Sequence, residues 1–196
     1  MPIEPPSPLL SDGEIALRPW RERDVLAIVA ACRDEDIAWW LDQVPQPYDE
    51  ADARTYVAMT RRGWKDGTHA AFAVTDAATG EVVGSVGLHW LDTEQGVAEV
   101  GYWVRRESRG QGVATRATRL AARWALTGCG MKRLQLRADS RNVASQRVAE
   151  SAGFRREGVL RSARFNQRQG RRVDFVLYSL LPDELDNLDV TSSPSS

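Results

Sequence analysis

The stretch from Val97 to Leu126 limits most narrowly what this chain can fold into. It reads VAEVGYWVRRESRGQGVATRATRLAARWAL: an apolar segment of strand type, a loop containing Gly110 and Gly112, and a helical segment with apolar side chains on one face. Glycines permit a tight turn and a close approach of a ligand, and the free N–H groups and dipole at the start of a helix attract anions. The passage therefore predicts a strand, a loop and a helix that together form an anion site, one that fits a pyrophosphate.

Two other kinds of phosphate-binding loop fit this passage poorly. A Walker A loop ends in Gly-Lys-Ser/Thr, and the chain has no lysine between Lys65 and Lys132, so this kind is excluded. A dinucleotide-binding loop needs a third glycine where Thr115 stands, although Asp139 ends the next strand about where a ribose-binding acid would lie. The predicted antiparallel strands before the loop are the wrong context for that fold, so the dinucleotide interpretation stays a weak alternative.

The spacing of apolar residues divides the rest of the chain into strands and helices. The predicted strands cover residues 13–20, 68–76, 81–91, 97–104, 132–139, 158–166 and 171–181, and the predicted helices cover 21–33, 35–41, 49–64, 112–127 and 142–152. Short loops join the three strands between 68 and 104, which is typical of an antiparallel meander. We expect an α/β protein of the α+β kind, with a mixed, mostly antiparallel sheet of about seven strands and helices on both faces.

The length of 196 residues and the composition, with 42% hydrophobic and 27% charged residues, are ordinary for one globular domain. We expect this domain to span residues 13–188, between flexible ends at 1–12 and 189–196 whose composition is rich in proline and serine. The longest apolar run, VLAIVAAC, is far shorter than a bilayer-spanning helix, and the first residues lack the features of a secretory signal. We therefore expect a cytoplasmic protein with no membrane partner.

Charge is distributed unevenly along the chain. Residues 1–104 carry 8 basic and 18 acidic side chains, residues 105–172 carry 18 and 4, and residues 173–196 carry 0 and 5. The basic block indicates an anionic partner, and nearly all of its basic residues are arginine, which grips phosphates through two hydrogen bonds. A coding bias toward arginine is the alternative explanation. The two cysteines, Cys32 and Cys129, are far apart in sequence and histidines are few, so we expect neither a disulfide nor a metal site.

Three motifs follow one another along the chain. They are AEVGYWV, then R-x-x-G-x-A at Arg109, Gly112 and Ala114, and then N-x-x-S and GF at Asn142, Ser145, Gly153 and Phe154. In this order and spacing they resemble the GNAT superfamily of acyl-CoA-dependent N-acetyltransferases, over most of the chain. The segments IALRPWRERD, GYWV and NVASQRVAESAGF are also similar to the branch that includes the amino-terminal acetylases of ribosomal proteins.

The resemblance implies a binding site for acetyl-CoA as cosubstrate. The loop matches the family segment whose main-chain N–H groups hold the CoA pyrophosphate, and the strand end before it matches the segment that pairs with the pantetheine arm, with Gly101 easing a bulge there. Asn142 matches a residue that hydrogen-bonds the pantetheine; it also fits a plain helix N-cap, and the two roles are compatible. The implied binding residues are Trp103, Val104, Arg109, Gly110, Gln111, Gly112, Val113, Ala114, Thr115 and Asn142.

Glu99 is the residue we expect to act as the general base. It is the only charged side chain between Glu94 and Arg105, in a strand that is apolar on both faces, so burial should raise its pKa toward a useful range. The alternative is that Glu99 pairs with an arginine of the basic block or lies at the rim of the sheet. Ser145 is the hydroxyl that could protonate the departing thiolate, or it is an ordinary helix-surface serine. His69, His89 and Tyr178 are weaker candidates for proton transfer.

Two features indicate where an acceptor would bind. Trp39 and Trp40 are adjacent and cannot both face inward from one helix, so at least one should border a cleft. Acidic residues of the first half of the chain would concentrate a cationic amine, and for this role we name Glu35, Asp36 and Asp42.

The sequence thus predicts a single-domain N-acetyltransferase that moves an acetyl group from acetyl-CoA to a primary amine. The resemblance to the ribosomal branch favours a protein amino terminus as the acceptor. The alternative is a module of the same fold that binds or senses acyl-CoA without turnover. A nucleic-acid partner is not expected, because the basic block surrounds a phosphate loop and contains no recognition helix; a homodimer is left open.

Overall fold

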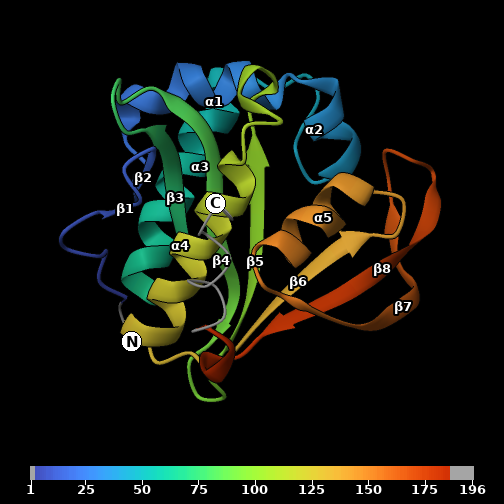
Figure 1. The fold of residues 1–196 in the computed structure, drawn as a ribbon. Helices are drawn as coiled ribbons and strands as arrows, with labels where there is room; N and C mark the ends of the chain where they lie inside the picture. Colours follow the sequence, from blue (N-terminus) through green and yellow to red (C-terminus); the bar gives the residue numbers. More distant parts are fainter. Residues whose placement is uncertain (1–2, 186–196) are drawn as a thin grey trace, which may run out of the picture.

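The computed structural model describes residues 3–185, and in it eight strands form one sheet (Figure 1). The strands are β1 (Leu10–Ser11), β2 (Ile15–Pro19), β3 (Ala70–Asp76), β4 (Val82–Asp92), β5 (Val97–Val104), β6 (Arg133–Asp139), β7 (Arg155–Asn166) and β8 (Arg171–Leu180). Their order across the sheet is β1-β2-β3-β4-β5-β6-β8-β7, and β5 with β6 is the one parallel pair among the described neighbours. The predicted mixed, mostly antiparallel sheet is confirmed, with one more strand than the seven we expected.

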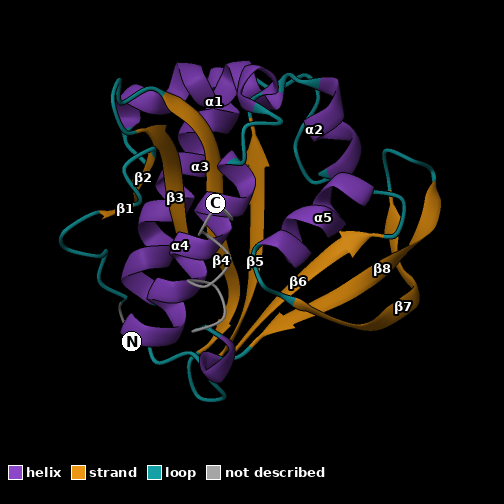
Figure 2. Ribbon diagram, viewed as in Figure 1, coloured by secondary structure: helices purple, strands orange, loops and turns teal. Residues whose placement is uncertain are grey.

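Helices cover both faces of this sheet, as predicted (Figure 2). They are α1 (Val25–Cys32), α2 (Glu35–Trp40), α3 (Glu50–Asp66), α4 (Val113–Gly128) and α5 (Val143–Ser151), with short 3-10 turns η1 (Glu22–Asp24), η2 (Arg106–Ser108) and η3 (Pro182–Glu184). Contacts place α4 against β2, β4 and β5, and α5 against β6 and β7, whereas α3 packs against β3 and against α1. Figure 1 shows α4 and α5 in front of the sheet and α1 and α3 behind it.

Local sequence signals explain where the long helices begin and end. Asp49 caps the first turn of α3 and forms a reciprocal capping box with Asp52, and Gly67 ends the helix in the left-handed conformation. In α4 many of the buried residues are small, with Ala121 and Ala125 fully buried. Small side chains let the helix axis approach the sheet closely, which fixes the position of its first turn relative to the end of β5.

Tryptophans supply much of the core. Trp64 and Trp124 pack with Phe72 between α3, α4 and β3, at ring separations of 5.0 to 5.6 Å. On the other face Trp20 stacks on Trp103 of β5 at 6.0 Å. Such pairs add about 0.5–1.5 kcal/mol each beyond the area that they bury. The packing covers β5 from behind at Trp103, the residue before its last one.

Several expected boundaries shift in the structure. The helix expected at 21–33 begins with η1 because Asp24 turns back to bind the N–H group of Arg21, and the strand expected at 158–166 begins earlier, at Arg155. Within the expected arm 1–12, Leu10 and Ser11 pair with β2. The tail expected at 189–196, and residues 186–188 of the expected domain, lie outside the described residues. Across residues 3–185, no helix combines the length and apolar character needed to span a bilayer.

Candidate functional site

β5 and β6 run side by side only over their first residues. The parallel register begins with Val97 opposite Arg133 and ends with Glu99 opposite Gln135. Beyond that point β5 stays paired with β4 on its other side, and β6 stays paired with β8. Figure 1 shows the two strands diverging from their shared lower end. From Val100 onward, the edge of β5 that faces β6 therefore presents main-chain groups that β6 does not bind.

The prediction that Gly101 eases a bulge in β5 is wrong. Gly101 lies in regular register opposite Gly87, and the irregular pairing is on the β4 side, between His89 and Asp92. A Cβ atom at Gly101 would come within 3.1 Å of the His89 ring. Glycine at this position makes room for the His89 ring, and the parting of β5 from β6 involves no bulge in β5.

The loop after β5 passes through η2 and enters α4 at Gly112. Gly110 and Gly112 have φ angles of +74° and +77°, in the left-handed region that side chains disfavour. Within residues 3–185, no side chain caps the first turn of α4. The N–H groups of that turn are thus left for water or a ligand, next to the positive end of the helix dipole. These N–H groups lie where the glycine loop predicted an anion site, and anion binding there stays a prediction.

The arginine side chains of this loop turn toward α2. The guanidinium of Arg109 lies 2.8 Å from Oδ2 of Asp36 and 3.2 Å from Oδ2 of Asp34, and Nε of Arg106 lies 3.0 Å from the same Asp34 oxygen. Asp34 also caps α2 by accepting hydrogen bonds from two of its N–H groups. These arginines, which we expected to face phosphates, join the loop to α2 in this structure, so phosphate binding here would rest on the backbone.

Glu99 is the last residue of β5 that pairs with β6, and its side chain is half-buried. Its Oε2 lies 2.7 Å from Nε of Arg137 on β6. Burial raises the pKa of Glu99 above its usual range, and this outweighs the opposite effect of the ion pair with Arg137 and of the positive charge on Arg164. The structure thus combines the two possibilities weighed for Glu99: it is desolvated, and it pairs with an arginine of the basic block.

Two residues of β4 border Glu99. His89 lies directly opposite Glu99 in the β4–β5 register, and burial, together with the nearby His69, lowers the pKa of His89. The shift favours the neutral form of His89, which is the form that can accept a proton. His69 itself lies over Gly63 of α3, where a Cβ atom would overlap its ring, which indicates a packing role. Trp90 follows His89 and places its ring 4.5 Å from the guanidinium carbon of Arg137.

On the opposite face of β5, Tyr102 reaches across to α5. Its hydroxyl donates a hydrogen bond to Oγ of Ser145 at 2.9 Å, and burial raises the pKa of Tyr102 to about 12. Because Ser145 accepts this bond, its own hydroxyl hydrogen can point elsewhere. The side chain of Asn142 accepts a hydrogen bond from the Ser145 N–H group and caps α5. Sequence analysis overlooked Tyr102, although the alternation of β5 places it on the face opposite to Glu99.

A family model described as an acetyltransferase (GNAT) domain matches residues 14–155 of the chain. The chain belongs to the GNAT acetyltransferase family. Among its relatives is the uncharacterized N-acetyltransferase p20 of Bacillus licheniformis, which is 26% identical over 170 residues, or 87% of this chain and 94% of p20.

Solved structures of GNAT acetyltransferases have the same fold. RimJ of Mycobacterium smegmatis, in complex with CoA-disulfide, superposes with a TM-score of 0.79 at 22% identity, covering 94% of this chain and 93% of RimJ. The ribosomal-protein-S5-alanine acetyltransferase of Vibrio fischeri superposes with a TM-score of 0.77 at 19% identity, covering 89% of this chain and 97% of that protein. At these identities the likeness shows the fold, so the site itself has to be argued from this chain's own residues.

In this GNAT domain, the tryptophans expected at the acceptor side lie on α2, which reaches the β7–β8 hairpin. Trp39 is exposed and Trp40 is half-buried, and the carbonyl of Trp39 accepts a bond from Gln169 of the hairpin. The carboxylate of Asp42 is buried and pairs with Arg164. Asp36 also pairs with an arginine, so the charges of Asp36 and Asp42 are both compensated. Of the three acids expected to attract an amine, Glu35 is the one without a partner among the ion pairs of residues 3–185.

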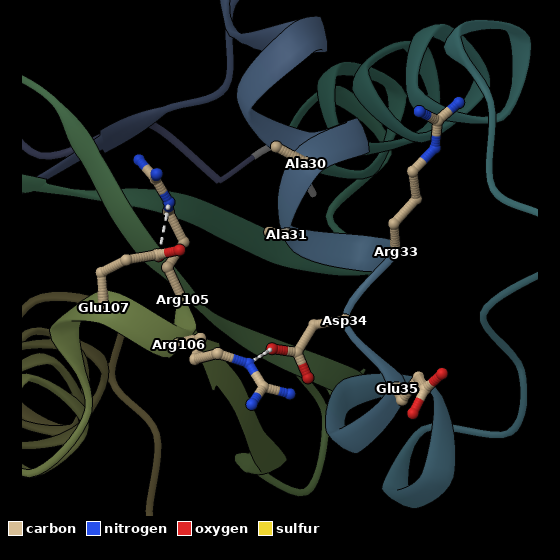
Figure 3. Close-up of a pocket in the computed structure, with 8 residues that line it drawn as sticks. All are labelled: Ala30, Ala31, Arg33, Asp34, Glu35, Arg105, Arg106 and Glu107. Atoms are coloured by element: carbon tan, nitrogen blue, oxygen red, sulfur yellow. Dashed lines mark hydrogen bonds and ion pairs between the residues drawn. The ribbon is translucent and has the colours of Figure 1, made fainter.

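A cavity of about 320 Å³ lies between the end of α1, the start of α2 and η2 (Figure 3). Its walls carry both signs of charge, and Arg106 points at Asp34 across it. No lining residue comes from β6 or α5, so this cavity is separate from the place where β5 and β6 part. Its lining residues are Ala30, Ala31, Arg33, Asp34, Glu35, Arg105, Arg106 and Glu107.

The remaining candidates for chemistry are accounted for by packing. Tyr178 of β8 is fully buried and its hydroxyl donates a hydrogen bond to Glu150. Cys32 and Cys129 are free thiols. Among residues 3–185 there is no group of three or more histidine, cysteine, aspartate or glutamate side chains arranged to hold a metal ion.

Proposed function

We propose that this GNAT domain, over residues 13–188, transfers an acetyl group from acetyl-CoA to a primary amine. One observation carries the proposal: β5 parts from β6 immediately after Glu99, and the same strand then leads into a glycine loop and an uncapped helix start. A half-buried carboxylate, an unpaired strand edge and an anion site therefore follow one another along a single strand. This is the order in which an amine, a pantetheine arm and a pyrophosphate would have to be bound.

Acetyl-CoA, when bound, supplies an activated thioester. The N–H groups from Arg109 to Thr115, through Gly110, Gln111, Gly112, Val113 and Ala114, face its pyrophosphate. The edge of β5 at Trp103 and Val104 pairs with the pantetheine arm as an added strand would, in place of the hydrogen bond that the Val104 carbonyl accepts from Nε of Arg109. Asn142 keeps its side-chain N–H₂ group for the pantetheine while its oxygen caps α5. In this arrangement the phosphates of acetyl-CoA are held mainly by backbone groups. This is consistent with Arg106 and Arg109, which pair with acidic residues at the start of α2.

Two proton transfers accompany the reaction, one to Glu99 and one from Ser145, and these residues lie on opposite faces of β5. Glu99 takes the proton from the amine, directly or through water, as the amine nitrogen bonds to the thioester carbon. A backbone N–H group near Trp103 donates to the carbonyl oxygen as negative charge develops there. The carbon–sulfur bond then breaks, and Ser145, oriented by Tyr102, gives its hydroxyl proton to the departing sulfur while it takes a proton from water. Trp39 and Trp40 border the side from which the acceptor enters.

A protein amino terminus is the acceptor that we favour. The names of RimJ and of the ribosomal-protein-S5-alanine acetyltransferase support this choice, because both proteins share the fold of this chain along nearly its whole length. The free N-terminal amine of a peptide is neutral in a useful fraction near pH 8, since its pKa is about 7.7–8.0. Glu99 then removes the proton that the attacking nitrogen sheds.

A second candidate function is a module that binds acyl-CoA without turnover. The observation that favours it is the ion pair between Glu99 and Arg137, which occupies the carboxylate that we assign as the base. The two functions make the same prediction for cofactor binding and opposite predictions for chemistry, so one pair of measurements separates them.

The test is thiol release from acetyl-CoA across a panel of amines, together with thermal melting in the presence of acetyl-CoA. An acetyltransferase releases thiol with at least one amine and is stabilised by about 2.7 kcal/mol at a ligand concentration 100 times Kd. Stabilisation without thiol release by any amine supports the binding module. Absence of both would contradict the acetyl-CoA site itself.

A further inference from the structure

Arg137 projects from the part of β6 that has left β5. It lies two residues beyond Gln135, the last β6 residue in register with β5, and so on the same face of the sheet as Glu99. Its side chain is 25% exposed, and its guanidinium carbon lies 4.5 Å from the ring of Trp90 and 5.7 Å from the ring of Phe175. Two aromatic rings thus fix the orientation of this cation beside the proposed base.

Trp90 is held in an unusual position for this contact. Its side chain is 71% exposed, although tryptophan is normally well buried, and its φ angle of +46° lies in the left-handed region. The β4 irregularity between His89 and Asp92 creates this conformation. A non-glycine residue in that region costs on the order of 1–3 kcal/mol, and such strain is found most often at functional sites. Among residues 3–185, the ring contact of this strained, exposed side chain is with the guanidinium of Arg137.

The charges around Glu99 are balanced only while Glu99 is ionised. Arg137 on β6 and Arg164 on β7 act on it, and His89 lies opposite it on β4. Arg164 is already paired with the buried Asp42. For Arg137, Glu99 is the one carboxylate within ion-pair distance among residues 3–185, and the contact is made through Nε. When Glu99 takes up a proton from an amine, Arg137 therefore loses its counter-charge in a half-buried setting.

We propose that Arg137 is a specificity-determining residue that binds a carboxylate of the acceptor through its terminal nitrogens. The acceptor class is then a primary amine that carries a carboxylate a few bonds away, either a free amino acid or a peptide whose first residue is acidic. The carboxylate replaces the charge that Glu99 loses as it accepts the proton. Planar bidentate binding of this kind is the particular property of arginine, and Trp90 and Phe175 hold the plane in place. The inference rests on the proposed acetyl transfer.

Two pairs of acceptors test the inference, and each pair differs in one carboxylate. Because a nearby carboxylate also raises the pKa of the amine, kcat/KM is compared per concentration of neutral amine. One pair is leucine with leucinamide, and the other is a tripeptide amide that begins with glutamate with its glutamine analogue. For the wild-type enzyme, kcat/KM should be at least about tenfold higher for the carboxylate member of one pair or of both, the size of a charge-assisted hydrogen bond. The pair that shows the preference identifies the source as a free amino acid or an acidic peptide. Equal kcat/KM within both pairs overturns the inference and leaves acetyl transfer standing.

Variants separate carboxylate binding from support of Glu99. In Arg137→Gln the preference should fall to about one, and Arg137→Lys should retain part of it. If Arg137 only holds Glu99 in place, Arg137→Gln lowers kcat for both members of a pair equally and keeps the ratio, which overturns the inference. Arg62→Gln, at an exposed arginine of α3 far from β6 in sequence, is the matched control and should keep the wild-type ratio.

A binding measurement keeps the inference testable without turnover. In calorimetric titrations of the CoA-saturated protein, the carboxylate ligand should bind at least about tenfold more tightly to Glu99→Gln than to the wild type, because Arg137 then has no competing partner. If no amine is acetylated, the proposed function fails, but the same titrations still test whether Arg137 binds a carboxylate. Tighter binding of the carboxylate ligand to the wild type, lost in Arg137→Gln, supports the inference. Equal binding of both ligands overturns it.

Discussion

The hydroxyl group of Tyr102 donates a hydrogen bond to Oγ of Ser145 across 2.9 Å, joining β5 to α5 beyond the point where β5 and β6 part. Asn142 fixes the same serine from its other side, by accepting a hydrogen bond from its N–H group. Ser145 is thereby oriented by two partners, and neither of them uses its hydroxyl hydrogen. Helix α5 and the free edge of β5 are held at a set distance by this contact.

Replacement of Ser145 by alanine should lower kcat by about 100-fold, the lower end of the range for general acid catalysis, and leave KM for acetyl-CoA nearly unchanged. Tyr102→Phe removes only the orienting bond and should have a smaller effect in the same direction. Steady-state kinetics of thiol release measure both. An unchanged kcat in Ser145→Ala would mean that the thiolate leaves without this proton, which the low pKa of a thiol permits.

The pH dependence of kcat/KM should reflect the ionisation of the Glu99 carboxyl group. Burial raises the pKa of Glu99 above the ordinary value of 4.5, and a base works only when it is deprotonated, so activity rises with pH through this shifted pKa. Arg137 opposes this shift, so in Arg137→Gln the pH range over which kcat/KM rises (the rising limb of the profile) should move to higher pH. Glu99→Gln should remove the limb and lower kcat/KM by at least about 100-fold.

His89 provides the control for this assignment. It lies opposite Glu99 and its pKa is lowered by burial, so it is the other group able to accept a proton there. The limb should survive in His89→Gln. If it vanishes in His89→Gln and persists in Glu99→Gln, the base has been assigned to the wrong strand.

Binding of acetyl-CoA should depend more on the loop backbone than on its arginine side chains. Gly112→Val places a branched side chain at φ +77°, at a cost of about 1–3 kcal/mol, and should raise Kd for acetyl-CoA at least about tenfold. Arg109→Gln removes a guanidinium that is paired with α2 and should raise Kd less. Calorimetry on both variants measures the difference, and a larger loss in Arg109→Gln would show that this side chain leaves Asp34 and Asp36 to bind phosphate.

The buried pair of Arg18 and Asp24 should matter for stability. It makes two hydrogen bonds, at 2.7 and 2.8 Å, and both side chains are almost fully buried. Asp24→Asn leaves Arg18 without its counter-charge and should reduce the free energy of unfolding by about 3–5 kcal/mol, measured in urea. Breaking the exposed pair of Arg62 and Asp66 should lower the free energy of unfolding by no more than about 1 kcal/mol. If both changes lowered it by the same amount, the buried pair would have no special role in stability.

The same pair sets an acid limit on stability. Burial acts to raise the pKa of Asp24, but its hydrogen bonds from Arg18 and Arg21 and the charge of Arg18 outweigh burial, so the folded pKa lies below the ordinary 3.8. The stabilisation is fully present above pH 3.8 and is lost as the pH falls through the lower, folded pKa. Urea titrations at a series of acidic pH values should show this loss in the wild type and its absence in Asp24→Asn.

Local patterns in the sequence were sufficient to predict most of the strands and helices and the glycine loop that leads into α4. The glycines at 110 and 112 adopt the left-handed conformation that such a loop requires, and Glu99 is partly buried, as expected in a strand that is apolar on both faces. These predictions succeeded because each depends on neighbours along the chain. The β1 strand was missed because two residues give no periodicity, and its formation depends on pairing with β2.

The partners of the site residues could not be predicted in the same way. Arg137 is 38 positions from Glu99, and Asp34 is 75 positions from Arg109, so only the fold brings them together. Counting charges by segment predicted an anionic partner for the basic block, and several of its arginines are instead paired with acidic residues of the first half of the chain. The same count assigned Asp36 and Asp42 to an amine, whereas both are compensated by arginines of the basic block.

A crystal structure of the protein grown with acetyl-CoA tests the central claim most directly. The account predicts the pyrophosphate against the N–H groups that begin α4 at Gly112, the pantetheine arm along the free edge of β5, and the thioester within reach of Glu99. A nucleotide bound elsewhere, for instance in the cavity between α1, α2 and η2 with the β5 edge left bare, would contradict it.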